Sequence, residues 1–235
     1  MTKKAGQSIV ILTGSGISAE SGLPTFRGSD GLWQGRRVEE VATPEAFERE
    51  PLLVQQFYNL RRAALQRVEP NAAHLALAAL EREWPGEYLL ITQNVDDLHF
   101  RAGSRRLLSI HGELRRARCL SCGADTPWME DLTPDSSCPR CHEVGKLRPH
   151  IVWFGEAPMH MDQCLDALSQ ADLFVAIGTS GKVYPAASFV DFVASRPGTR
   201  RLELNQEATG NPRFNEVRIG PATETVQALV AELLA

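Results

Sequence analysis

Apolar runs rich in β-branched residues recur along the chain, and each run ends at a glycine or a polar residue. This pattern predicts strands at residues 8–13, 88–92, 107–110, 172–178 and 201–205. Apolar residues at helical spacing predict helices at residues 44–68, 71–84 and 186–195, and a further helix is expected to open at residues 18–21. Because strands alternate with helices, we expect an α/β fold with a doubly wound, parallel, Rossmann-like sheet.

Two stretches interrupt this alternation. Residues 113–149 contain few periodic apolar residues and four cysteines, which predicts a small module inserted between two strands of the main sheet. Residues 36–70 are expected to form a helical segment. We therefore interpret the 235 residues as one domain, whose Rossmann-like core comprises residues 1–35, 71–112 and 150–235.

Composition narrows the class of protein. A content of 43% hydrophobic and 23% charged residues is that of a globular domain with a full-sized core. The formal net charge of -4 argues against general nucleic-acid binding, which requires an excess of lysine and arginine. The apolar run after the N-terminus is too short for a signal peptide or a membrane span. We expect a soluble, cytoplasmic protein with no membrane partner.

Four of the five cysteines form two Cys-x-x-Cys pairs, Cys119 with Cys122 and Cys138 with Cys141, which are separated by fifteen residues. In a chain expected to be intracellular, this spacing predicts a four-thiolate Zn²⁺ site that is structural because the protein fills every ligand position. A redox pair or unligated cysteines are the alternatives. The neighbouring His142 is interpreted as a surface residue. A zinc ribbon can itself bind nucleic acid, so a binding module competes with an enzyme at this point.

The segment from Gly14 to Ala19 has the relaxed G-x-G-x-x-A form of the dinucleotide fingerprint, with Gly16 as its second glycine. Such glycines let the backbone approach a pyrophosphate at a helix start. A tight turn without a ligand explains the fragment equally well. A dehydrogenase would continue with a strand ending in an acidic residue. Here a loop follows instead, and it carries Arg27 and aromatic residues.

The motifs in their order closely resemble the sirtuin family over nearly the whole chain. They are GSGISAESGLPTFR at residues 14–27, QNVD at 93–96, HG at 111–112, the four cysteines, RPHIVWFGE at 148–156, GTS at 178–180, LN at 204–205 and GPA at 220–222. Two departures are Ser15, where the family usually has alanine, and Val95, where isoleucine is common.

The resemblance implies that NAD is the co-substrate, that the Zn²⁺ is structural, and that acyl groups are removed from lysine side chains. In the family the acyl oxygen attacks the ribose carbon as nicotinamide leaves, and a histidine then deprotonates a ribose hydroxyl. His111 is the residue implied as that base, and an imidazole suits the task because it titrates near neutral pH. The implied NAD-binding residues are Gly14, Ser15, Gly16, Ala19, Phe26, Arg27, Trp33, Gln93, Asn94, Val95, Asp96, Gly178, Thr179, Ser180, Asn205, Gln206 and Ala222.

The resemblance also implies the substrate side of the site. The apolar segment Val152, Trp153, Phe154 and Gly155 could be buried core, but by resemblance it pairs with an extended, acylated peptide through backbone hydrogen bonds. Tyr58 and Arg61 share one helix face, and by composition alone they are a packed tyrosine beside a solvated arginine. They nevertheless resemble the signature of sirtuins that remove succinyl groups, with Ala42 enlarging the acyl pocket.

We therefore expect an enzyme that removes acetyl and succinyl groups from protein lysines and yields nicotinamide and O-acyl-ADP-ribose. ADP-ribosyl transfer to protein is the closest alternative, because another nucleophile can capture the same activated ribose. A dehydrogenase and a zinc-dependent binding module are more distant, since neither explains the QNVD and HG blocks.

Overall fold

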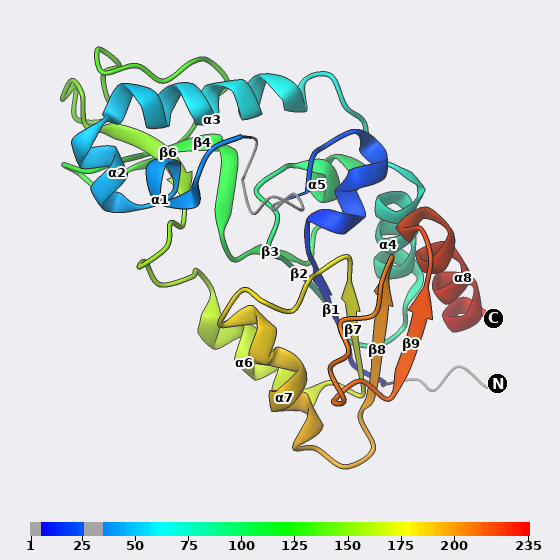
Figure 1. Cartoon of the computed structure of the whole chain (residues 1–235). Coiled ribbons are helices and arrows are strands. Elements are labelled where there is room, and N and C mark those ends of the chain that lie inside the picture. The colour runs from blue at the N-terminus through cyan, green and yellow to red at the C-terminus, as the bar shows by residue number, and fades with distance from the viewer. Residues whose placement is uncertain (1–5, 26–34) are drawn as a thin grey trace.

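A computed structural model describes residues 6–25 and 35–235 of the chain (Figure 1). Its main sheet has six strands in the order β3-β2-β1-β7-β8-β9, and every neighbouring pair is parallel. The strands are β1 Ile9–Thr13, β2 Tyr88–Thr92, β3 Leu107–Ser109, β7 Leu173–Ile177, β8 Arg200–Asn205 and β9 Glu216–Ile219. The predicted doubly wound parallel sheet is therefore confirmed. The edge strand β9 was not predicted; its four residues alternate polar and apolar side chains, but none of them is buried.

Helices cover both faces of this sheet (Figure 1). On one face α4 (Ala72–Glu83) and α8 (Ala222–Leu234) pack on a core that includes Ile11, Val175 and Leu204. On the other face lie α6 (Met161–Gln170), the short 3₁₀ helix η2 (Ala186–Ser188) and α7 (Phe189–Ala194). A short helix, α5 (Leu98–Ala102), follows β2.

The helical segment beside the sheet contains α1 (Val38–Val41), α2 (Pro44–Arg49) and α3 (Pro51–Leu65). The prediction of one helix over residues 44–68 is wrong, because Glu50 has φ −139° and ψ 67° between two helices. Pro51 explains the break, since proline disfavours helical backbone in the residue before it and has no N–H to donate. The helix expected to open at residue 18 is instead a 3₁₀ helix, η1 (Ser15–Ser21), that begins at the glycine turn.

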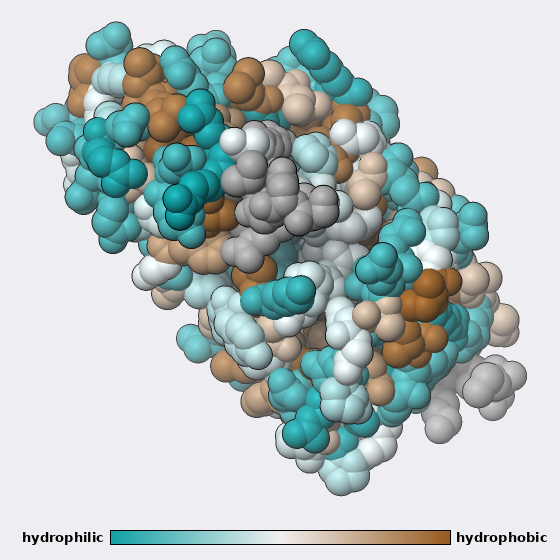
Figure 2. All heavy atoms as spheres, viewed as in Figure 1, coloured by the Kyte–Doolittle hydropathy of each residue, from teal (hydrophilic) through white to brown (hydrophobic). Residues whose placement is uncertain are grey.

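A second sheet of three antiparallel strands lies beside the helical segment, and it contains β4 (Gly112–Cys119), β5 (Asp125–Pro127) and β6 (Leu147–Ile151). A shared core joins α3 to β4 and β6 through Tyr58, Leu114 and Ile151. The face of the molecule seen in Figure 2 is mostly hydrophilic, with hydrophobic residues in small groups. Within the described residues, no helix is long and apolar enough to cross a membrane.

Candidate active site

The residues singled out in the sequence gather where the parallel strands end. Gly14 follows β1, Gln93 follows β2, and Gly178 follows β7. His111 lies two residues after β3, and Gln206 directly follows β8. The carboxyl ends of parallel strands open at one edge, and ligands bind there where the strand order reverses, which is between β1 and β7.

The glycine turn packs backbone against backbone on the loop after β7. The Gly14 N–H donates to the Ile177 carbonyl, and the Gly16 N–H donates to the Gly178 carbonyl, each at 2.9 Å. A Cβ atom on Gly16 would lie 2.7 Å from Gly178 Cα, and one on Gly178, whose φ is +59°, would lie 2.5 Å from Ile17 N. Only glycine permits this approach. Because the glycines carry no side chains, backbone atoms are left uncovered at the carboxyl edge of the sheet. Recognition of a pyrophosphate requires such a backbone surface.

A small pocket beside this turn contains several of the residues predicted to hold adenosine. It is lined by Gly16, Gly178, Leu204, Asn205, Gln206, Gly220 and Ala222. Asn205 Nδ2 donates to the Thr179 carbonyl at 2.9 Å, and Gln93 Nε2 donates to the Thr179 hydroxyl at 3.1 Å. These bonds hold the loop after β7 between β2 and β8. Ser180 is exposed on this loop, and Ala19 is exposed on η1 outside the pocket lining.

The geometry of His111 assigns its tautomer. Its Nδ1 lies 3.1 Å from the Gln93 carbonyl oxygen, which can only accept a hydrogen bond. Nδ1 therefore carries the proton, and the lone pair of Nε2 is left to act as a base. Burial lowers the pKa of His111, and the hydrogen bond to Gln93 opposes that shift. Gly112 must be glycine, because a Cβ there would meet the His150 carbonyl oxygen at 2.0 Å.

A buried polar cluster lies under the same edge. The Ser18 hydroxyl donates to Asp96 at 3.0 Å and accepts from Asn94 Nδ2 at 3.1 Å. His74 Nε2 lies 3.4 Å from the same hydroxyl. Burial raises the pKa of the Asp96 carboxyl, and hydrogen bonds from the Leu98 N–H and Ser18 oppose the rise. The cluster fixes the Asn94 and Asp96 side chains, so it holds the polar groups that the sequence assigns to the nicotinamide side.

Tyr58 and Arg61 lie on α3, and Tyr58 belongs to the core that α3 shares with the small sheet. Tyr58 is fully buried, and its hydroxyl oxygen accepts a 2.9 Å hydrogen bond from Trp153 Nε1. Burial raises the pKa of Tyr58, so its hydroxyl stays protonated. Burial lowers the pKa of Arg61 to about 10, and Tyr58 and Asp96 oppose that shift. Arg61 therefore remains charged at neutral pH. Tyr58 is packed, as composition alone predicts, and Arg61 is half-buried rather than fully solvated.

The segment from Val152 to Gly155 connects the small sheet to this site. The Val152 N–H donates to the His111 carbonyl at 2.9 Å, and the Phe154 N–H donates to the Ala42 carbonyl at 3.0 Å. Trp153 is buried in the core that also contains Ala42, whereas Phe154 and Gly155 are exposed. The segment is thus neither wholly core nor wholly surface.

The ion pair between Arg148 and Glu156 holds Trp153 in place. Arg148 donates to both oxygens of Glu156, at 2.7 and 2.9 Å, and its guanidinium carbon lies 3.4 Å from the Trp153 ring centroid. Glu156 in turn accepts from the Trp153 N–H at 2.8 Å. These two residues fix the indole that contacts Tyr58. Arg148 and Glu156 lie within the motif at residues 148–156, but their roles were missed because charged residues give no periodic signal.

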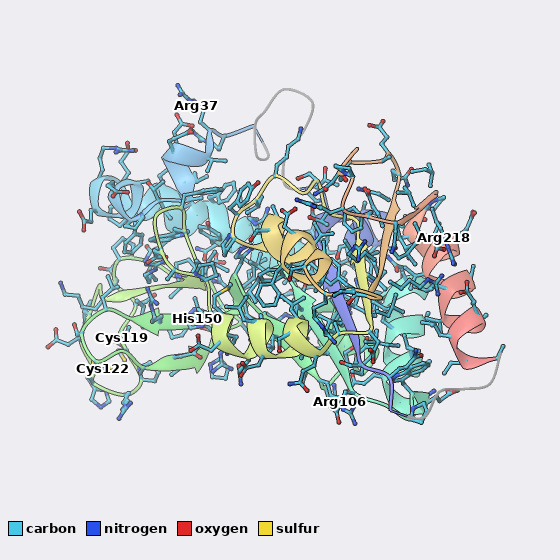
Figure 3. All side chains as sticks on the ribbon, turned by 90° about the horizontal axis from the view of Figure 1, so that it is seen from below. Arg37, Arg106, Cys119, Cys122, His150 and Arg218 are labelled. Carbon is cyan, nitrogen blue, oxygen red and sulfur yellow. The ribbon has the colours of Figure 1, made fainter. Side chains whose placement is uncertain are left out.

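The four paired cysteines meet at the tip of the small sheet, where Figure 3 labels Cys119 and Cys122 at the opposite end of the molecule from Arg218. Their sulfur atoms all lie within 4.8 Å of one another, and the distances are 3.7 Å from Cys119 to Cys141 and 3.8 Å from Cys122 to Cys138. Four thiolates about 2.3 Å from a tetrahedral Zn²⁺ are about 3.8 Å apart, so the cluster fits zinc. The other predicted site residues lie elsewhere, which agrees with a structural ion.

Three predicted residues, Phe26, Arg27 and Trp33, lie outside the described part of the chain. Two contributors were not predicted at all, Ser18 and Thr13. The Thr13 hydroxyl donates to Thr92 Oγ1 at 2.9 Å and lies 3.0 Å from His99 Nε2. Thr13 and Thr92 end their strands, and a polar residue at the carboxyl end of a buried strand is the signal that could have identified them.

Comparison with known proteins is consistent across the chain. The model of the Sir2 family matches residues 14–185. A protein named NAD-dependent protein deacylase from Bdellovibrio bacteriovorus is 52% identical over 231 residues, which cover 97% of each chain. The protein of the same name from Escherichia coli K12 is 52% identical over 230 residues, covering 96% of this chain and 82% of the relative.

Solved structures give the same result. A Sir2 homologue in complex with NAD has a TM-score of 0.87 and 42% identity, and the match covers 96% of this chain and 89% of that one. A Sir2 protein with a deacetylated p53 peptide and 3′-O-acetyl ADP-ribose has a TM-score of 0.80 at 29% identity, with 96% and 93% covered. The matched family model, the identity to relatives over nearly the full length and the shared fold lead to one conclusion: this chain belongs to the Sir2 family.

Proposed function

We propose that this protein removes acyl groups from lysine side chains of other proteins in a reaction that consumes NAD. The products are nicotinamide, O-acyl-ADP-ribose and the free lysine. Relatives that are 52% identical over nearly the full chain carry the name NAD-dependent protein deacylase, which supports this activity. We also infer that residues 36–70 and 113–149 serve as a helical segment and a zinc module of one catalytic domain.

NAD binds along the carboxyl edge of the main sheet. The glycine turn, with Gly14 and Gly16, faces the pyrophosphate, and the pocket that contains Asn205 and Ala222 receives the adenosine. Asn94 and Asp96 provide amide and carboxyl groups for the nicotinamide and its ribose. The backbone contacts of Gly16 with Gly178 and the hydrogen bond between Ser18 and Asp96 support this assignment. Phe26, Arg27 and Trp33 are proposed to cover the reacting ribose.

His111 is the general base. The acyl oxygen of the substrate lysine attacks the ribose carbon, nicotinamide leaves with the bonding electrons, and His111 then takes the proton of a ribose hydroxyl. That oxygen attacks the acyl carbon, water completes the transfer, and the lysine amine is released. The observation that carries the proposal is the 3.1 Å contact between His111 Nδ1 and the Gln93 carbonyl, because it leaves Nε2 as the basic atom at the edge where the strands end.

Acetyl and succinyl groups are both substrates. The acyl group enters between Ala42, Tyr58 and Arg61, and the acylated peptide binds as an extended strand along residues 152–155. Arg61 supplies a charged, planar donor group to a succinyl carboxylate, and the Tyr58 hydroxyl supplies a further hydrogen bond. The buried position of Tyr58 and the charge retained by Arg61 support this specificity.

The test uses two peptides of one sequence whose single lysine is acetylated or succinylated. Each is incubated with the protein and NAD, and mass spectrometry follows the peptide, nicotinamide and the ADP-ribose product. We expect loss of the acyl mass from the peptide, with an equal amount of O-acyl-ADP-ribose. An ADP-ribosylated peptide that keeps its acyl group would instead favour the transferase, and NADH formation would favour a dehydrogenase.

A further inference from the structure

A second cavity, of about 140 Å³, lies on the other face of the main sheet from the pocket that contains Ala222. Phe174 and Ala176 of β7 line it, and they belong to the core beneath α6 and α7. Leu204 belongs to the core on the opposite face. Because side chains alternate along a strand, Glu203 of β8 projects toward the cavity that Phe174 lines. The two pockets are therefore distinct sites.

The cavity has an apolar floor and a polar mouth. The floor contains Leu12, Phe174, Ala176, Val190 and Phe214. Exposed residues of the loop after β7, Ser180 to Lys182, form part of the mouth. A ligand could enter past this loop without opening the sheet. An apolar cavity of about 150 Å³ is large enough to hold one benzene ring, so this cavity matches a single-ring compound.

Glu203 places a buried carboxylate in the lining of the cavity. Its side chain is 1% exposed, which is unusual for a carboxylate. It accepts hydrogen bonds from the Thr209 N–H at 2.8 Å, the Thr209 hydroxyl at 2.9 Å and Asn205 Nδ2 at 3.3 Å. All three donors are neutral. Among the described residues, no lysine, arginine or histidine nitrogen forms a salt bridge with Glu203.

A buried carboxylate that lacks a cationic partner is costly, and a bound cation would offset that cost. Each carboxylate oxygen can accept two hydrogen bonds, so the Thr209 hydroxyl that donates to Oε2 leaves acceptor capacity there. We propose that this cavity binds a small organic cation, an amidinium or primary ammonium carried on a single apolar ring, with its N–H groups donating to Glu203. The ligand goes beyond the deacylation reaction, although Thr179 and Ser180, which the resemblance assigns to NAD, also line the mouth of this cavity.

Substitution of Lys182 tests whether the cavity attracts a cation. Lys182 is exposed at the mouth, and its positive charge repels an incoming cation through solvent. If Glu203 attracts a cationic ligand, Lys182→Ala should raise the affinity modestly, by about twofold. If Lys182 is instead a cationic partner that the Glu203 carboxylate requires, the same substitution should destabilise the fold and leave ligand affinity without a gain.

The binding experiment uses benzamidine as the probe and the full chain without NAD or peptide, so its outcome does not depend on the proposed deacylation. Isothermal titration calorimetry measures the affinity, and amide chemical shifts of Ser180 and Thr209 report the location. Glu203→Gln removes the charge at constant shape and should weaken binding at least tenfold, by about 1.4 kcal/mol. Ala187→Leu fills the cavity from η2 and should abolish binding while Glu203 keeps its charge.

Benzyl alcohol is the neutral control, and it should bind more weakly than benzamidine to the wild-type protein. The Ala187→Leu variant keeps the proposal testable even if Glu203→Gln does not fold. Equal benzamidine affinity in the wild type and in Ala187→Leu would overturn the proposal, because the probe would then bind elsewhere. Absence of binding at concentrations of about 10 mM would overturn it as well.

Discussion

The indole Nε1 of Trp153 donates a 2.9 Å hydrogen bond to the hydroxyl oxygen of Tyr58, 95 residues away along the chain. Both side chains are buried, and both ring systems belong to the core that joins α3 to the small sheet. Because the Tyr58 oxygen accepts a hydrogen bond from Trp153, its own O–H bond must point in another direction. Trp153 thus helps to set the orientation of the hydroxyl that we assign to the acyl group.

Replacing Trp153 by phenylalanine tests this relationship. The variant keeps an aromatic ring but removes the N–H donor, so the Tyr58 hydroxyl loses its fixed orientation. We expect the KM for a succinylated peptide to rise about threefold to tenfold, as for one hydrogen bond of about 0.5 to 1.5 kcal/mol. Deacetylation should change much less. Matched steady-state kinetics with Tyr58→Phe as the reference variant decide the point, and equal losses on both peptides would indicate a purely structural role.

Arg61→Met should damage removal of succinyl groups and largely spare removal of acetyl groups. The substitution preserves much of the side-chain volume but deletes the charge that we propose to face a succinyl carboxylate. Loss of one charge-assisted hydrogen bond of about 1.5 to 3 kcal/mol should raise the succinyl KM roughly tenfold to a hundredfold. The adjacent Arg62, which donates to the Leu114 carbonyl instead, provides a control. Arg62→Met should affect stability and should not discriminate between the two acyl groups.

His111→Ala should reduce kcat/KM by a factor of about 10² to 10⁴, the usual contribution of a positioned base. In the wild type, only neutral His111 accepts a proton, and burial lowers its pKa below the ordinary value of 6.5. The activity should therefore be retained as the pH falls toward 6.5 and be lost only at a lower pH. A pH profile of kcat/KM measures this limb, and an acidic limb above pH 6.5 would contradict the assignment.

His74 and His99 should make the fold sensitive to acid. Their rings are buried 4.8 Å apart, and burial lowers the pKa of His74 to about 4 and that of His99 well below 6.5. Below pH 6.5 the unfolded chain binds protons that the native histidines do not, so stability falls as the pH decreases. For His74 alone the loss between pH 7 and pH 5 should be about 2 kcal/mol.

Urea unfolding at several pH values measures this loss. The exposed His160 serves as the control, and His160→Asn should leave the pH dependence unchanged while preserving its left-handed backbone. His74→Asn should flatten the dependence. An unchanged slope in His74→Asn would show that other groups cause the acid sensitivity.

Removal of the metal should unfold the small sheet first. Cys138 is buried at the tip of this sheet, and Cys138→Ser deletes one thiolate ligand. We expect loss of bound zinc by atomic absorption, a lower melting temperature, and loss of activity as an indirect consequence. A strong chelator should act in the same way on the wild type. Full activity and an unchanged melting temperature in a zinc-free protein would contradict a structural role.

Local pattern was sufficient for the elements and motifs whose signal is continuous in the chain. Residues 9–12 and 173–177 are all apolar because both faces of the sheet are covered, so each strand is seen in the sequence as an uninterrupted apolar run. The cysteine spacing also predicts a cluster from local sequence alone, because the two cysteines of each pair lie in one short, tight loop. Pro51 is itself a signal for a helix break, but the helical periodicity on both sides of it led to the prediction of a single helix.

The tertiary structure decided which distant side chains meet. Tyr58 and Trp153 lie on separate elements, and no local pattern predicts that one donates to the other. The burial of Glu203 is equally invisible, because an acidic residue in a strand ordinarily indicates an exposed face. Such contacts depend on how the helical segment, the two sheets and the helices pack, and packing is fixed by the whole chain rather than by neighbours in sequence. The sequence by itself determined the strands and the motif residues at their ends, whereas only the packed fold determined what those residues touch.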